Sequence, residues 1–223
     1  MVFVGAGCPS DHGVELLRSL VSLMLDLTSA LTRWFAEGLA SAEFVPFGSQ
    51  PWWRFTGLIL AGRAFDLGST FLATPRLRLE GNPIARRLGW RGGILLSVLM
   101  ALIFGGWPLI AISLTTTSAL VAARNFQHAW IMRSMGEAGY QSWFSERVWE
   151  SPVWLVMGCH WAEALMAGLP GVSLLIWGED TRVSLGIGLG LTAYGGAVAG
   201  FSTWVLSHLW RDRLRYQRSD RVD

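Results

Sequence analysis

The chain has 223 residues, of which 52% are apolar and only 15% are charged. Soluble globular domains carry about 25% charged residues, so this composition excludes a disordered chain and a coiled coil and argues against an ordinary soluble enzyme. Two cysteines are too few for a secreted disulfide scaffold, and a formal net charge of +2 does not suggest a nucleic-acid partner. The sequence therefore predicts an all-α, polytopic membrane protein.

The N-terminal stretch Val14–Ala40 has the pattern of an amphipathic helix. Its polar residues recur every three or four positions and form one narrow stripe: Arg18, Ser22, Asp26, Ser29, Arg33 and Glu37. Charges in its middle make it a poor membrane span, so residues 1–53 are expected to form a segment that lies in the interface. A sixth crossing is the alternative, and it would place the N-terminus inside.

Several later segments are long and apolar enough to cross about 30 Å of hydrocarbon, which takes about 20 residues. Residues 56–74, 152–177 and 183–210 each meet this requirement. Residues 92–123 contain no charge, but the stretch is too long for one ordinary span and slightly short for two.

Charge placement decides how to count this neutral stretch. The loop 75–91 and the tail 211–223 are rich in arginine, and arginine-rich short segments stay in the cytoplasm. An even number of crossings must therefore separate them, so residues 92–123 are predicted to form a tight helical hairpin broken at Gly105–Pro108. The result is a five-span membrane domain at 54–210 in the cell inner membrane, with the N-terminus outside and a basic cytoplasmic tail.

Ionisable residues inside the predicted spans are the candidate polar site. Arg63 and Asp66 lie three apart on the first span, and His160 and Glu163 lie three apart on the fourth, so each pair shares a helix face. Both carboxylates fall about 15 Å from the start of their spans, near the middle of the bilayer, where they could meet. Thr70, one helical turn after Asp66, completes the candidate set.

Two interpretations of this set remain open. In the structural one, Arg63 neutralises a carboxylate and the hydrogen bonds specify which helices pack together. In the functional one, the set is a proton relay, an ion or metal site, or a headgroup site. A single His-x-x-Glu is a weak metal signal, and no catalytic set, nucleotide loop or paired-cysteine site is present, so no cofactor is predicted.

A loop motif follows the first span. Asp66 and Thr70 are followed by Glu80, Asn82 and Pro83, and Asn before Pro is a good helix start. This pattern, over about residues 56–125, resembles the small bacterial and archaeal membrane proteins grouped as domain of unknown function 5658. The resemblance implies a short helical bundle of unassigned activity. The motif either fixes the turn at the membrane surface or lines an entrance leading toward Asp66.

The lipid bilayer is the expected partner, and two features favour a membrane-protein partner as well. The fifth span carries glycines four residues apart, which serve helix packing inside the bundle or a contact with another copy. The segment 124–151 is polar but rich in Trp and Phe, as expected of a surface helix or a docking face. We therefore expect an accessory or assembly subunit rather than an enzyme. The alternative is a small transporter or membrane-embedded enzyme with a mid-bilayer Asp/His/Glu site.

Overall fold

The computed structural model describes residue 22 and residues 44–79, 83–178 and 181–219. The chain divides into two compact units, Met1–Glu43 and Phe44–Asp223, and only the second is described below. The amphipathic helix predicted at Val14–Ala40 lies outside the described residues, apart from Ser22.

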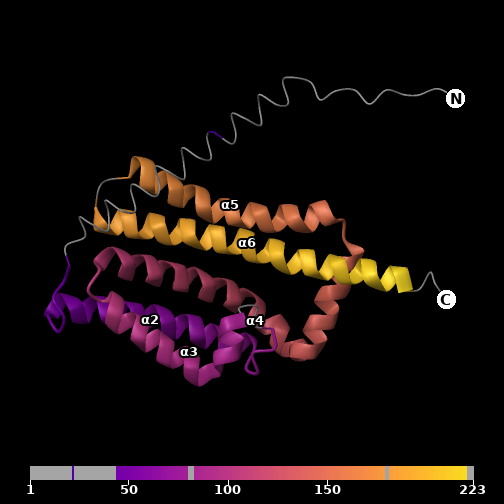
Figure 1. Ribbon diagram of the computed structural model, residues 1–223, viewed down its shortest axis with the longest axis horizontal. Coiled ribbons are helices and arrows are strands. Elements are labelled where there is room, and N and C mark those ends of the chain that lie inside the picture. The colour runs from indigo at the N-terminus through magenta and orange to yellow at the C-terminus, as the bar shows by residue number, and fades with distance from the viewer. Residues whose placement is uncertain (1–21, 23–43, 80–82, 179–180, 220–223) are drawn as a thin grey trace. The chain divides into compact units, whose positions relative to one another are not determined.

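The second unit consists of helices, and its described residues contain no strand, which confirms the all-α prediction (Figure 1). The five helices are α2 (Gln50–Ala73), α3 (Pro83–Phe104), α4 (Pro108–Glu150), α5 (Val153–Trp177) and α6 (Arg182–Ser219). Among the described residues, four segments are long and apolar enough to cross a membrane: Ala85–Phe104, Pro108–Glu150, Val153–Trp177 and Arg182–Arg211. Helix α2 is not one of the four, and its charged side chains lower its hydropathy.

The predicted break between α3 and α4 is confirmed. Helix α3 ends at Phe104, and α4 begins at Pro108, a residue suited to the first position of a helix. A Cβ atom at Gly105 would lie 2.2 Å from Thr56 Oγ1, so only glycine allows the end of α3 to approach α2 this closely. The neutral stretch therefore folds back on itself rather than continuing as one rod.

Consecutive helices run in opposite directions. The hydroxyl of Thr56 donates to the carbonyl of Ala101 (3.4 Å), while Phe71 further along α2 contacts Trp90, so α2 and α3 are antiparallel. Helices α2 and α4 are parallel, because Gly62 lies beside Thr115 and Ser69 lies beside residue 125.

The second half of the bundle follows the same order. Gly186 packs against Ile112 and Gly190 against Thr116, so α6 runs parallel to α4. Helix α5 is antiparallel to α6, with Gly171 beside residue 188 and Gly168 beside residue 195. It follows that the turn after α2, the α4–α5 connection and the C-terminal end of α6 lie at one end of the bundle (Figure 1).

Helix α4 continues well beyond Ala123, where the sequence placed the end of the third span. No helix-breaking residue occurs until Gly136, which has φ 72° and ψ 159° and separates a second helical segment, 137–150, from the first. Figure 1 shows this second segment turning away toward the start of α5. The indole of Trp149 donates to the carbonyl of Leu209 (3.3 Å), which joins the segment to α6.

Two further boundaries differ in detail from the sequence expectations. Helix α3 begins at Pro83, as predicted, but Gly89 (φ 62°) separates its short first part from the apolar remainder. Glu80 and Asn82 lie outside the described residues. Helix α6 continues to Ser219, so most of the segment predicted as a tail extends this helix.

Candidate functional site

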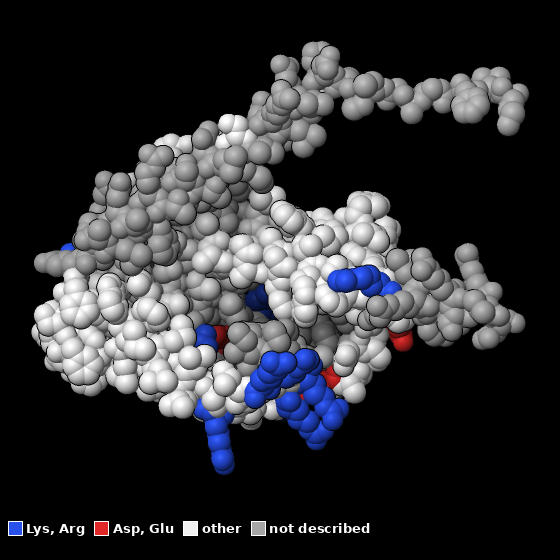
Figure 2. Space-filling model, viewed as in Figure 1, with Lys and Arg blue, Asp and Glu red and all other residues white. Residues whose placement is uncertain are grey.

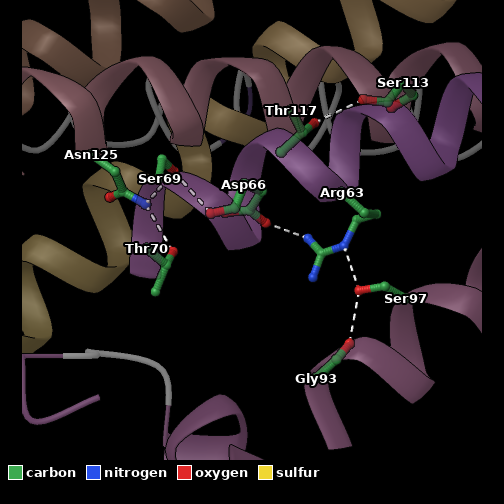
Figure 3. Close-up of polar contacts among 9 residues, drawn as sticks. All are labelled: Arg63, Asp66, Ser69, Thr70, Gly93, Ser97, Ser113, Thr117 and Asn125. Atoms are coloured by element: carbon green, nitrogen blue, oxygen red, sulfur yellow. Dashed lines mark hydrogen bonds and ion pairs between the residues drawn. The ribbon is translucent and has the colours of Figure 1, made fainter. Parts of the chain in front are cut away.

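A series of polar contacts joins α2 to its neighbours, and Arg63 connects α2 to Ser97 in α3 (Figure 3). The Arg63 guanidinium forms an ion pair with Asp66, and its Nε donates to the hydroxyl of Ser97 in α3 at 3.1 Å. The side chains of Arg63 and Asp66 are 24% and 14% exposed. Pairing lowers the cost of placing both charges among apolar helices, so the predicted association of Arg63 with Asp66 is present.

A second group of contacts in this series joins α2 to α4 through Asn125. Its amide donates to the hydroxyls of Ser69 (3.2 Å) and Thr70 (3.0 Å), and Ser69 in turn donates to the backbone carbonyl of Asp66 (2.8 Å). Figure 3 shows the Asn125 amide directed between these two hydroxyls. Ser69 and Thr70 are buried, so Thr70 belongs to a helix–helix contact.

A second polar cluster joins α4, α5 and α6, and we call Arg124, Glu163 and Tyr194 the Glu163 cluster. Arg124 Nε lies 3.2 Å from Glu163 Oε1, and the Tyr194 hydroxyl donates to the same oxygen at 3.3 Å. The side chains of Arg124 and Glu163 are 30% and 40% exposed. One carboxylate oxygen therefore connects three helices.

The structure assigns the two carboxylates to different arginines. Because α2 and α4 are parallel and Gly62 lies beside Thr115, Asp66 lies nearer the α3–α4 turn than Arg124 does. Asp66 pairs with Arg63, and Glu163 pairs with Arg124. His160, one turn before Glu163, is half-buried, and its Nδ1 lies 2.8 Å from the carbonyl of Val156 in its own helix.

Four partners in these clusters were missed from the sequence: Ser97, Arg124, Asn125 and Tyr194. Arg124 and Asn125 had been assigned to a segment beyond the membrane because the neutral stretch ends at Ala123. Their adjacency was the available signal: neighbouring residues on a helix point about 100° apart, so one can face α2 while the other faces α5 and α6.

The chemistry within reach of these clusters is limited by their composition. Each contains one guanidinium and one carboxylate, so each is neutral overall. In the part of the chain that the structure describes, no three His, Cys, Asp or Glu side chains gather closely enough to hold a metal ion. The arrangement can hold helices in register and can receive a polar group at the partly exposed Glu163.

The glycines of α6 divide into two sets. Those that contact other helices are closely packed: a Cβ at Gly190 would lie 2.8 Å from the carbonyl oxygen of Ser113 in α4, and one at Gly195 would lie 2.6 Å from that of Ala164 in α5. Gly196 and Gly200 have nothing within 4 Å of such an atom, and both are exposed. We call these two residues the open glycine face of α6.

Comparison with protein-family models, with curated proteins and with solved structures yields no match to this chain.

Proposed function

We propose that this chain is a five-span inner-membrane protein that acts as an accessory or assembly subunit of a membrane complex. Four described segments have the length and composition of spans. We assign the fifth crossing to α2, because its contacts with α3 run from Thr56 beside Ala101 to Phe71 beside Trp90, along much of both helices. A helix that lies antiparallel along a span crosses the same thickness. The ion pair between Arg63 and Asp66 lowers the cost of placing these two charges in the membrane.

The proposed orientation places the turn after α2 in the cytoplasm together with the C-terminus. Arg76, Arg78, Arg86, Arg87 and Arg91 lie at or near this end of the bundle, and Arg211 lies near the end of α6. The opposite end, between α5 and α6, carries Glu179 and Asp180 in sequence. Arginine-rich turns remain on the cytoplasmic side, so this asymmetry supports a cytoplasmic C-terminus.

Cysteine labelling tests this orientation. In a background with Cys8 and Cys159 replaced by serine, Trp107→Cys should react with a membrane-impermeant maleimide in intact spheroplasts. Arg78→Cys should react only after the membrane is opened. The reverse pattern would refute the orientation, and labelling of both positions before opening would refute the span count between them.

The proposed assembly role rests on the open glycine face. Small residues four apart allow two helices to approach closely in lipid, where packing rather than hydrophobicity drives association. The closely packed glycines of α6 already contact α4 or α5, whereas a Cβ atom added at Gly196 or Gly200 would have no described atom within 4 Å. A transmembrane helix of a partner subunit fits this face.

Substitution on the open glycine face tests the proposal. The tagged chain purified in a mild detergent should bring down a partner in a fixed ratio, and Gly196→Leu should abolish this while the chain still accumulates in the membrane. Gly158→Leu on α5 is the matched control, because Gly158 is also exposed with nothing within 4 Å. Equal recovery of the partner with both variants would refute the role of this face, and a clean wild-type monomer would refute the assembly function.

A second candidate, a small transporter or membrane-embedded enzyme, is supported by one observation. Glu163 lies within α5, yet its side chain is 40% exposed, so a polar group can reach it. This function predicts that Glu163→Gln and Asp66→Asn abolish activity while the chain accumulates normally. Loss of accumulation would favour the structural role of both carboxylates.

The relation to the domain of unknown function 5658 also stays a proposal. It is supported by the pattern from Asp66 to Pro83 and by the start of α3 at Pro83. This relation implies a helical-bundle topology but no particular activity.

A further inference from the structure

A cavity of about 380 Å³ opens between the turn after α2 and the break in α4. Arg76 and Arg78 line it from the turn, and Arg133, Glu137 and Gly139 line it from α4. Figure 2 shows basic side chains gathered on the face where this turn and the start of α3 lie. The volume is at the small end of the range for ligand sites, which suits a single headgroup better than a large molecule.

Glu137 holds the two walls of the cavity together. Its Oε1 accepts a hydrogen bond from the backbone N–H of Arg76 (2.8 Å) and another from the hydroxyl of Thr74 (3.1 Å). The Thr74 hydroxyl also accepts from the N–H of Leu79 (3.2 Å), which ties the turn to the same point. The carboxylate is therefore used to position the backbone of the turn rather than to neutralise an arginine.

The three arginines have no anionic partner among the residues that the structure describes. Within the described residues, Arg76, Arg78 and Arg133 form no ion pair, and all three are exposed. Three positive charges face one negative charge, so the cavity has an excess of positive charge. Ala138 and Gly139, which also line it, belong to the first turn of the helical segment after Gly136. The N–H groups and the dipole at a helix start favour a bound anion.

The depth of the cavity matches the phosphate level of a membrane. Helix α4 runs from Pro108 to the cavity wall at Met132, a rise of ~37 Å at 1.5 Å per residue. The hydrocarbon core is about 30 Å thick, so the cavity lies just beyond it. Trp130, which is 70% exposed, lies near the same depth, where indole side chains are typical of the membrane interface.

We propose that this cavity binds a phosphodiester, and specifically the phosphate of an anionic phospholipid headgroup. The guanidinium groups of Arg76, Arg78 and Arg133 supply paired N–H donors that match phosphate oxygens. Glu137 is a positioning residue that fixes the turn on which two of the arginines stand. The proposal rests on the proposed membrane embedding, but not on the partner assigned to α6.

Short-chain lipids added to the purified full-length chain test the site. In a neutral detergent, dioctanoyl-phosphatidylglycerol should raise the midpoint of thermal unfolding in a saturable way, whereas dioctanoyl-phosphatidylcholine should raise it far less. The double variant Arg76→Gln, Arg133→Gln should weaken the apparent affinity for phosphatidylglycerol at least tenfold. Because both residues are exposed, these changes should leave the fold intact.

The matched control is the double variant Arg86→Gln, Arg87→Gln, which removes the same charge from exposed positions that do not line the cavity. It should retain the wild-type affinity, and an equal loss in both variants would overturn the site in favour of diffuse charge attraction.

Glycerol 3-phosphate distinguishes a lipid headgroup from a free phosphate ester as the ligand. It should need at least a tenfold higher concentration than the lipid, and equal potency would overturn the lipid assignment. Release of the chain from membranes by alkaline extraction would instead refute the membrane embedding itself.

Discussion

Two adjacent glycines in α6 provide the sharpest test of the packing described above. An added Cβ at Gly195 would lie 2.6 Å from the carbonyl oxygen of Ala164 and 2.9 Å from the Cα of Gly168, both backbone atoms of α5. At Gly196 the same atom would meet nothing within 4 Å. Gly195→Ala and Gly196→Ala therefore make the same chemical change in the same helix and differ in the neighbouring helix.

The size of the effect follows from the distance that α5 must move. Ordinary contact begins at 3.4 Å, so Gly195→Ala requires a separation of ~0.8 Å between two backbones. Overpacking of this kind costs about 1–3 kcal/mol, and the better helix propensity of alanine returns about 0.5–1 kcal/mol. We expect a net loss of ~1–2 kcal/mol for Gly195→Ala and a gain of ~0.5–1 kcal/mol for Gly196→Ala.

The measurement is the midpoint of thermal unfolding of each purified variant in the same detergent. For a chain of this length, 1 kcal/mol shifts the midpoint by about 2–4 °C. Gly195→Ala should therefore lower the midpoint by ~2–8 °C, and Gly196→Ala should leave it unchanged or raise it slightly. Equal shifts, or a larger loss at Gly196, would show that α5 does not pack on α6 through Gly195.

Three further substitutions test the polar contacts and the break in α4 by the same assay. Asn125→Ala removes two hydrogen bonds between α4 and α2 and should cost about 1–3 kcal/mol; an unchanged midpoint would contradict that contact. Glu163→Gln leaves Arg124 without its carboxylate, and because exposure within a membrane span is to lipid or detergent rather than to water, the loss should exceed the about 1 kcal/mol typical of a pair in water; a smaller loss would contradict the position of this pair within the spans. Gly136→Ala places a side chain at φ 72° and ψ 159°, a conformation essentially restricted to glycine, and should cost about 1–3 kcal/mol. The control Gly139→Ala, whose new Cβ meets only ordinary contact at 3.8 Å, should cost nothing.

The helices were predictable because the length of an apolar segment and the positions of glycine and proline are local properties of the sequence. The break at Gly105–Pro108 needed one additional argument, the sidedness of the arginine-rich segments, and that argument gave the correct number of helices from α3 to α6. The end of α4 was not predictable in the same way. A change from apolar to polar composition at Ala123 indicates where lipid contact decreases, but the backbone continues as a helix until Gly136 changes its φ.

That boundary error explains which site residues the sequence could not supply. The sequence placed Asp66 and Glu163 at similar depths, where they could meet, and with Arg124 assigned beyond the membrane it offered Glu163 no arginine except Arg63. In the structure each carboxylate pairs with an arginine of its own. The rotation of each helix is the missing information: a spacing of four identifies candidate faces, but only the packing shows that Gly195 lies against α5 while a Cβ atom at Gly196 would meet nothing within 4 Å.

The distribution of unpaired polar groups indicates where in the molecule ligands and partners should be sought. Arg124 and Asn125 are neighbours in α4, yet one holds α5 and α6 through Glu163 and the other holds α2 through Ser69 and Thr70. The two arginine–carboxylate pairs are thus engaged in contacts between helices, and a ligand there must compete with an existing pair. The arginines around the cavity at the end of α2 face no such competition within the described residues, and neither does the open glycine face of α6. Binding should therefore occur at the membrane surface and along α6 before it occurs at the centre of the bundle.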